Sequence, residues 1–357
     1  MSKICMGCMA PFEEEFEICP FCGFVEGTKA TVAFHMEPGS ILRERYIIGK
    51  VLGFGDFGVT YIGWDAVLEL KVAIKEYLPS EFSTRFPGQS QVIIFEDGSK
   101  YKQVIDGLIR FIEEAQRLAK FHSLEGIVKV FDSFADNNTA YIIMEYLDGE
   151  TLAERLKKQN TIPPDEAISM LMPIIRSLQI VHAEGIIHRN VSPDNIFLTK
   201  DGKVKLIDFG AYRFELTQLM QNILAIFTPA YSPEEQYYRR PDDLGSHTDV
   251  YAIGATLYRM ITGVTPPDAL NRRFCFERKQ KDILKPVSRY CKAVSTNQEI
   301  AILNALNARI EDRTLDMIAL ENELVSEAPI KRKHGKIKKI DMLKWLLWVK
   351  LRRLWRR

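Results

Sequence analysis

The sequence predicts an α+β protein in which a β-rich lobe is followed by a helical lobe. From Arg45 to Glu145 the chain alternates short β-branched and aromatic runs with turns, which is typical of antiparallel strands. After Asp148-Gly149 the apolar residues recur at helical spacing, in long segments that end at glycine. A ligand is expected in the cleft between two such lobes.

Each lobe can be divided further. The first should contain one amphipathic helix, at about 104–121, and five strands, at 46–52, 59–64, 71–77, 127–134 and 140–145. The second should contain helices at 165–184 and 248–262, ended by Gly185 and Gly263. Between these helices we expect a hairpin of 196–199 and 203–207, turned by Asp201-Gly202.

The charge of the chain is unevenly distributed. Its 357 residues include 48 Lys and Arg against 47 Asp and Glu, for a formal net charge of +1. Residues 331–357 contain twelve of the basic residues and one acid, which leaves 36 basic and 46 acidic residues in 1–330. An acidic body with a basic tail argues against a nucleic-acid-binding surface over the whole chain.

Four cysteines near the N-terminus form two C-x-x-C pairs, Cys5/Cys8 and Cys19/Cys22. This spacing predicts a structural Zn²⁺ site in a zinc ribbon, with Gly7 or Gly23 letting backbone amides approach the sulfurs. A redox pair is the alternative, but no βαβ pattern surrounds these cysteines. The acidic loop of the ribbon disfavours nucleic acid, and its partner is unknown. Cys275 and Cys291 are expected to be ordinary thiols.

The tail at 331–357 has leucines at helical spacing, three tryptophans and a basic opposite face. It is expected to form an amphipathic helix that lies on an anionic membrane surface. A disordered tail, a partner-binding helix and an autoinhibitory segment remain as alternatives. The N-terminus has no secretory signal and no stretch is long enough to span a bilayer. We therefore expect a cytoplasmic protein, peripheral at the inner face of the membrane.

Two motifs of the first lobe have chemical meaning. Gly53, Gly55 and Gly58 form a G-x-G-x-x-G segment between two predicted strands, which disfavours a dinucleotide fold because that fold needs a helix next. Lys75 ends the run Val72-Ala-Ile-Lys75, and a buried lysine is costly unless it is paired. Glu113 and Glu114 of the predicted helix at 104–121 are the available partners.

Four more motifs follow in the second half of the chain: His188-Arg-Asn190, Asn195, Asp208-Phe-Gly210 and Ser232-Pro-Glu234. In this order and spacing the set resembles the protein kinase family, specifically the bacterial serine/threonine kinases, over roughly residues 45–325. The resemblance implies an ATP- and Mg²⁺-dependent enzyme with a protein substrate. It implies domains at 1–24 (zinc ribbon), 25–44 (linker), 45–147 (N-lobe), 148–328 (C-lobe) and 329–357 (tail).

The resemblance also implies a role for each motif residue. The glycine-rich segment would cover the phosphates of ATP, Lys75 would bind them and be held by Glu114, and Asn195 and Asp208 would hold Mg²⁺. Arg313 would be the buried partner of Glu234, and Asp249 would anchor the catalytic loop. The adenine would be enclosed by the residues near the lobe junction and in the first strands, namely Val59, Ala73, Met144, Glu145 and Leu147.

Three positions depart from the family pattern. Asn190 stands where the family has its catalytic Asp, Ser192 where most members have Lys, and Phe227 where Gly is usual. An amide can orient a hydroxyl group but is a negligible base. Two function classes therefore remain open: a serine/threonine kinase weakened by Asn190, and a pseudokinase that acts as an ATP-binding switch or scaffold. A third hypothesis, a zinc-ribbon adaptor with a passive body, predicts no ATP binding.

Two further features remain open. The insertion at 76–103 is either a regulatory surface or an ordered surface loop. The segment from Asp208 to Glu234 offers Thr217 and Thr228 as its only threonines, and we do not expect regulation by their phosphorylation. The sequence does not identify the substrate, the activating signal or the oligomeric state.

Overall fold

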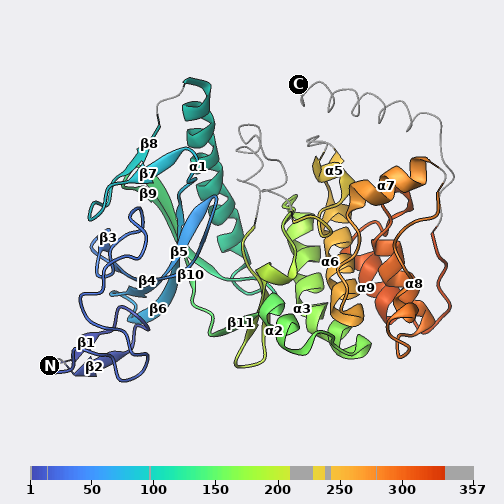
Figure 1. Ribbon diagram of the computed structural model, residues 1–357, viewed down its shortest axis with the longest axis horizontal. Coiled ribbons are helices and arrows are strands. Elements are labelled where there is room, and N and C mark those ends of the chain that lie inside the picture. The colour runs from blue at the N-terminus through green and yellow to red at the C-terminus, as the bar shows by residue number, and fades with distance from the viewer. Residues whose placement is uncertain are drawn as a thin grey trace. The chain divides into compact units, whose positions relative to one another are not determined.

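The computed structural model describes residues 2–13, 15–95, 98–209, 228–237, 243–278 and 280–333. The chain divides into two compact units (Figure 1). The first unit consists of Met1–Glu150 and Phe197–Ile226, and the second of Thr151–Ile196 and Phe227–Arg357. The two-lobed fold predicted from the sequence is confirmed, with an antiparallel β N-lobe, a helical C-lobe and a four-cysteine cluster at the N-terminus.

The first unit is built on a six-stranded antiparallel sheet in the order β3-β4-β5-β6-β10-β9 (Figure 1). Neighbouring residues in its strands point to opposite faces, so one face of each strand can be buried. The predicted strands are all present, with limits that differ by a few residues from those expected. They are β4 (Tyr46–Gly55), β5 (Gly58–Asp65), β6 (Leu70–Tyr77), β9 (Val130–Asp136) and β10 (Thr139–Glu145), and the short edge strand β3 (Ile41–Leu42) was not predicted.

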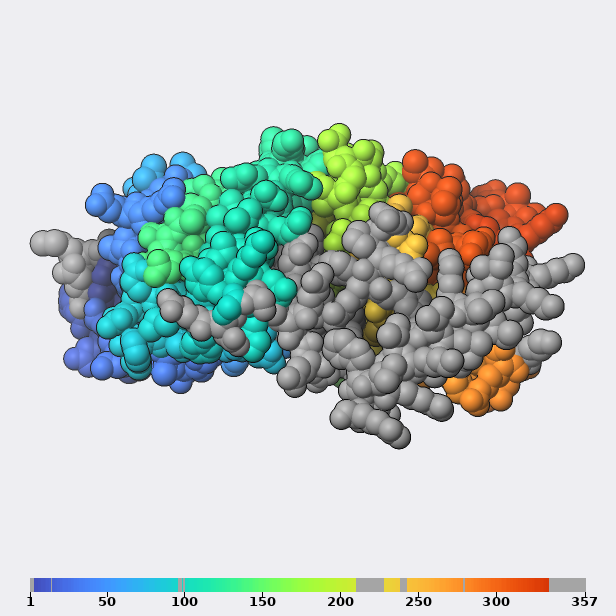
Figure 2. All heavy atoms as spheres, turned by 90° about the horizontal axis from the view of Figure 1, so that it is seen from above, coloured from blue at the N-terminus to red at the C-terminus, as the bar shows by residue number. Residues whose placement is uncertain are grey.

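One long helix, α1 (Gly98–Leu118), packs on β9 and β10 and continues into the short η1 turn (Ala119–Phe121). It begins six residues before the expected start at 104, because its first turn is polar and lacks the apolar repeat that marks the rest. Val104, Phe111 and Ala115 are buried on its inner side. Its outer side lies at the surface, as the teal spheres in Figure 2 show.

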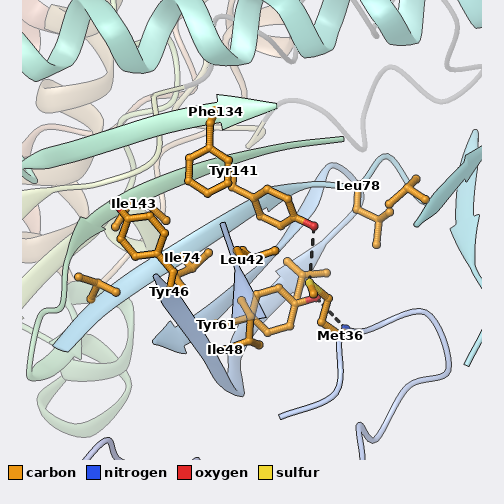
Figure 3. Close-up of a cluster of buried hydrophobic side chains, with 13 residues drawn as sticks. Met36, Leu42, Tyr46, Ile48, Tyr61, Ile74, Leu78, Phe134, Tyr141 and Ile143 are labelled. Atoms are coloured by element: carbon orange, nitrogen blue, oxygen red, sulfur yellow. Dashed lines mark hydrogen bonds between the residues drawn. The ribbon is translucent and has the colours of Figure 1, made fainter. Parts of the chain in front are cut away.

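The core of the first unit lies on one face of this sheet (Figure 3). Met36 belongs to it, although residues 25–44 were expected to be a linker. The Met36 backbone N–H donates to the Tyr61 hydroxyl over 3.1 Å, and Met36 Sδ lies 3.5 Å from the Tyr141 hydroxyl oxygen. Leu42 is also fully buried here. This segment is therefore part of the folded lobe.

The insertion at 76–103 includes a second small sheet, formed by β7 (Ser83–Arg85) and β8 (Val92–Ile94). Arg85 is buried and forms an ion pair with Glu76, which is itself inaccessible to solvent. The hydroxyls of Tyr61 and Tyr141 also donate to Glu76, each over 2.9 Å. A buried polar network therefore links the insertion to the main sheet. Breaking the pair of Arg85 and Glu76 would be costly, because it would leave a buried charge without a counter-charge.

Two smaller sheets complete the strands of the chain. β1 (Ser2–Ile4) pairs with β2 (Pro11–Glu13) beside the cysteines. β11 (Gly149–Thr151), β12 (Ile196–Thr199) and β13 (Val204–Leu206) form a three-stranded sheet. The predicted hairpin is therefore present, and Gly202 has the left-handed conformation (φ 83°) that its turn requires.

The second unit is helical. The long predicted helices correspond to α3 and α6, and α6 ends at Gly263 in a left-handed cap (φ 71°). α6 packs on α3, α8 and α9. The described helices are α2 (Leu152–Gln159), α3 (Pro164–Ala183), α5 (Glu234–Tyr237), α6 (Ser246–Thr262), α7 (Ala269–Glu277), α8 (Thr296–Ala305) and α9 (Met317–Val325), with short turns η2 (Pro193–Asn195), η5 (Val287–Arg289) and η6 (Ile310–Asp312).

Candidate active site and metal centre

The four N-terminal cysteines converge. Their sulfur atoms all lie within 4.8 Å of one another, with Cys5 Sγ 3.6 Å from Cys22 Sγ and Cys8 Sγ 3.8 Å from Cys19 Sγ. Zn–S bonds of about 2.3 Å at tetrahedral angles place sulfurs about 3.8 Å apart, so the cluster fits Zn²⁺. The Gly7 backbone N–H donates to Cys5 Sγ over 3.2 Å, as predicted. Cys275 and Cys291 take no part in a cluster among the described residues.

The cysteine cluster is joined directly to β4. Between Cys5 and Cys8, the Met6 carbonyl accepts a hydrogen bond of 2.7 Å from the Lys50 backbone N–H. Met9 is fully buried and lies so close to Gly49 that a Cβ atom there would be 2.2 Å from Met9 Cε. Because β4 continues from these residues into Gly53 and Gly55, the cysteine cluster packs against the strand that carries the glycine-rich segment.

The three glycines of the glycine-rich segment differ in their surroundings. Gly55 pairs with Gly58 across a two-residue turn between β4 and β5. A Cβ atom at Gly53 or Gly55 would meet no heavy atom of the described residues within 4 Å, so among these residues the space beside their backbone is open. At Gly58 it would lie 2.2 Å from the Glu76 carbonyl oxygen. Gly53 and Gly55 thus leave room for a ligand, whereas Gly58 permits close packing against β6.

Lys75 and Asp208 form an ion pair within the first unit. Lys75 lies on β6 and its ammonium is 5.9 Å from the centre of the Phe111 ring on α1. Glu114, one helical turn beyond Phe111, is buried at 9% exposure. The predicted Lys75–Glu114 pair stays a prediction. Asp208 has a positive φ of 62°, which is uncommon for a residue other than glycine.

Four of the five residues predicted to enclose adenine lie in the same sheet as Lys75, and Leu147 follows the end of its strand β10. Met144 on β10 pairs with Ala73 on β6, and Val59 is buried on β5. The Glu145 carboxylate accepts from Lys205 Nζ over 2.6 Å, which fixes the end of β10 against β13. The backbone of Leu147 forms no hydrogen bond within the described part of the chain, so its polar groups are available to a ligand.

The His188–Asn190 loop of the second unit is fixed by Asp249. The fully buried Asp249 carboxylate accepts from the backbone N–H groups of His188 and Arg189 at 2.8 and 2.9 Å, and lies 2.8 Å from His182 Nε2. Burial alone would raise the pKa of Asp249, but these partners hold it below its usual value. Asp249 lies in the first turn of α6, as predicted.

Asn190 and Asn195 are held together within this unit. The Asn195 side-chain amide donates to the Asn190 carbonyl over 2.8 Å. Arg189, between His188 and Asn190, has a left-handed φ of 64°. The Ser192 hydroxyl is buried and makes no hydrogen bond to any described residue. This unsatisfied donor lies beside Asn190, at one of the positions where the sequence departs from the family pattern.

The predicted pairing of Arg313 with Glu234 is wrong. Arg313 binds Glu235 instead, with its two terminal nitrogens 2.5 and 3.1 Å from the carboxylate oxygens. Glu234 lies 3.4 Å from Arg273, which is also bound to Glu277 over 2.8 Å. The two glutamates are adjacent in α5, so their sequence context did not distinguish them. Which one faces Arg313 is decided by the packing of α5.

Sequence reasoning also missed three asparagines on and just after α8. The side chain of Asn304 donates to the Lys331 carbonyl over 3.0 Å and accepts from the Lys333 backbone N–H over 2.8 Å. Asn297 on α8 and Asn307, two residues after its end, bind the same segment at 328–333. The spacing of seven residues between Asn297 and Asn304 places these two on one helix face, a signal that the sequence did contain.

Several predictions lie outside the described residues. These predictions concern Gly210, Thr217, Phe227 and most of the basic tail at 331–357. The amphipathic membrane helix therefore stays a prediction. Among the residues that the structure describes, no helix is both long enough and apolar enough to cross a membrane.

Comparison with known proteins identifies relatives for most of the chain. A model of the protein kinase domain matches residues 46–334. The serine/threonine-protein kinase PknB of Mycobacterium leprae is 29% identical over 306 residues, covering 81% of this chain and 45% of PknB. PknL of Mycobacterium tuberculosis is 30% identical over 228 residues, covering 64% of this chain and 51% of PknL. The chain thus spans about half the length of these curated relatives.

Solved structures give the same fold. The structure titled "PpkA-294 apo form" has a TM-score of 0.70 and 29% sequence identity, and the match covers 82% of this chain and all of that one. The structure of Rad53 1-466 in complex with AMP-PNP has a TM-score of 0.57 and 20% identity, covering 81% of this chain and 66% of that one. The second similarity is evidence for the fold alone.

Proposed function

Because this chain belongs to the protein kinase family, we propose that it transfers the terminal phosphoryl group of ATP to serine or threonine hydroxyls of a protein, at a reduced rate. The observation that carries this proposal is the pair of Lys75 and Asp208, side by side next to the open backbone of the glycine-rich segment. A cation and a carboxylate held together in this way suit a phosphate and its metal ion.

The first unit would hold the nucleotide. The backbone of Gly53 and Gly55 has open space in which phosphates can approach, and Leu147 offers free backbone groups for the edge of adenine. Lys75 would bind phosphate oxygens as a point charge. Within this unit the carboxylate of Asp208 is a hard donor that suits Mg²⁺, and in the second unit the amide oxygen of Asn195 is a donor of the same kind. A bound Mg²⁺ would neutralise charge on the phosphates.

In the reaction, the substrate oxygen forms a bond to the terminal phosphorus while the bond from that phosphorus to ADP breaks, and the hydroxyl proton passes to a phosphate oxygen or to water. Asn190 can accept a hydrogen bond from the hydroxyl and orient it, but cannot take up the proton. General-base assistance is typically worth about 10²–10⁴-fold. The loose transition state of phosphoryl transfer leaves positioning and charge neutralisation as the larger contributions, so activity should persist at a low level.

Asn190 also favours a second function, that of a pseudokinase whose ATP binding acts as a switch or scaffold. The binding residues Lys75, Asn195 and Asp208 are all present, whereas the base is not. Under this alternative the protein binds nucleotide with an affinity similar to that of an active kinase, and transfers no phosphate.

The two functions are separated by a radiolabelled-ATP assay on a generic protein substrate. The forms compared are the natural chain, Asn190→Asp, Lys75→Met, and the control Asn271→Asp, which makes the same chemical change at an exposed position on α7. We expect slow transfer by the natural chain and the control, none by Lys75→Met, and a rate increase of about 10²-fold or more in Asn190→Asp. No transfer by any form, together with measured ATP binding, would establish the switch instead.

A further inference from the structure

A cavity of about 460 Å³ in the second unit has more cationic than acidic side chains among its described lining residues. It lies among α7, η5, α8, η6 and the segment that ends at Arg332. Two of these lining residues are acidic, Asp282 and Asp312, and the six cationic ones are Arg272, Lys281, Lys285, Arg289, Arg309 and Arg332. None of these residues has a role in the proposed phosphoryl transfer.

The two acidic residues are already engaged. Asp282 binds Arg272 through two hydrogen bonds of 3.2 and 2.8 Å, in the forked geometry typical of an arginine and a carboxylate. Asp312 lies 3.6 Å from Arg309. Arg272 and Arg309 therefore have counter-charges, and the remaining four cations form no ion pair with any carboxylate that the structure describes.

Arg332 is the most constrained of these four cations. Its guanidinium donates to the amide oxygen of Asn304 over 3.0 Å, and Asn304 is fully buried. Burial and the nearby positive charge of Arg272 lower the pKa of Arg332 to about 10. A guanidinium with a lowered pKa is held in a place that disfavours its charge, and a bound anion would relieve this cost.

We propose that this cavity binds a small molecule that carries a phosphate-type oxyanion with at least two negative charges. The cations approach from α7, the η5 region and the segment after α9, so they can surround a tetrahedral group from several sides. Guanidinium groups match the geometry of phosphate oxygens, and lysines add point charges. The volume falls in the usual range for small-molecule sites, about 300–1,000 Å³, and exceeds the needs of phosphate alone.

The test uses pyrophosphate as the probe and the full chain as the protein. Isothermal titration calorimetry and thermal unfolding are compared for the natural chain, Lys285→Gln/Arg332→Gln, and the control Lys157→Gln, which removes an exposed charge on α2. The variant Lys75→Met identifies pyrophosphate that binds at the proposed nucleotide site, because binding at that site should be lost in this variant. We expect the double variant to lose at least tenfold in affinity for the cavity site, while the control and Lys75→Met retain that site.

Stability without ligand provides an independent readout. Since Arg332 is a half-buried cation with no ion-pair partner among the described residues, the double variant should unfold at the same temperature as the natural chain or at a higher one. A folded double variant that binds pyrophosphate as tightly as the natural chain would overturn the proposal. The proposal would also be overturned if a phosphoserine peptide bound at the cavity and pyrophosphate did not. The ligand of the cavity would then be a protein segment and not a small molecule.

Discussion

Arg313 holds Glu235 with both terminal nitrogens of its guanidinium, and both side chains are almost completely buried, at 0% and 2% exposure. The neighbouring Glu234 has only a 3.4 Å contact with Arg273. The pair joins α5 to the segment after η6, across 78 residues of sequence. Arg313 thus binds the second of two consecutive glutamates. The two glutamates should therefore differ in how much each contributes to stability.

Replacing Glu235 should destabilise the protein much more than replacing Glu234. Glu235→Gln leaves the Arg313 charge buried without a counter-charge, and removal of one partner of such a pair costs about 3–5 kcal/mol. Glu234→Gln should change the free energy of unfolding by no more than about 1 kcal/mol near pH 7, because it replaces a poorly paired carboxyl group. Urea unfolding followed by circular dichroism measures both. Equal losses in the free energy of unfolding would mean that Arg313 interacts with both Glu234 and Glu235.

Glu234 should also make stability depend on pH. Burial raises its pKa from 4.5 to about 7, although the charge of Arg273 opposes the shift. Between these two values the folded state binds the proton more tightly than the unfolded state does. The free energy of unfolding should therefore fall as the pH rises from about 4.5 to 7, and the loss should be complete above pH 7.

The measurement is urea unfolding of the natural chain and Glu234→Gln at several pH values from 5 to 8. The difference between the two proteins should shift in favour of the variant as the pH rises, since Gln does not titrate. A constant difference across this range would contradict the assignment of this titration to Glu234.

Removing the metal should weaken the first unit and its nucleotide binding together. Met6, between Cys5 and Cys8, and Met9, directly after Cys8, contact Lys50 and Gly49 of β4. If this segment unfolds, the burial of Met9 alone accounts for about 1.5–3 kcal/mol. Cys8→Ser should lose zinc, unfold at a lower temperature and bind an ATP analogue more weakly. Cys275→Ser is the matched control. Unchanged ATP-analogue binding by zinc-free protein would contradict this coupling.

Alanine substitutions should separate the three glycines of the glycine-rich segment. Gly58→Ala would place a Cβ atom 2.2 Å from the Glu76 carbonyl, and such overpacking costs about 1–3 kcal/mol. Gly53→Ala and Gly55→Ala would meet no neighbour and should change stability by less than about 0.5 kcal/mol. Thermal unfolding of the three variants without nucleotide tests this. Equal stability of all three variants would show that the backbone of β6 moves to make room for a Cβ atom at position 58.

Much of the fold could be predicted from local sequence. Period-two and helical patterns placed β4, β5, β6, α3 and α6 to within a few residues, because burial of one face leaves a regular apolar repeat. The start of α1 was less accurate, since its first turn is polar and exposed. Residues 25–44 have no periodicity, and their contribution of Met36 to the core was not expected from sequence.

The sequence by itself determined the two-lobed fold, the cysteine cluster and the kinase motifs, because each depends on residues at fixed spacing along the chain. Only the tertiary structure decided that Arg313 binds Glu235, that Gly58 is required by the carbonyl of Glu76, and that Arg332 joins other cations around a cavity. These relationships join segments far apart in sequence, or distinguish neighbours of identical chemistry. Their outcome depends on how the packed elements are oriented, which local pattern does not specify.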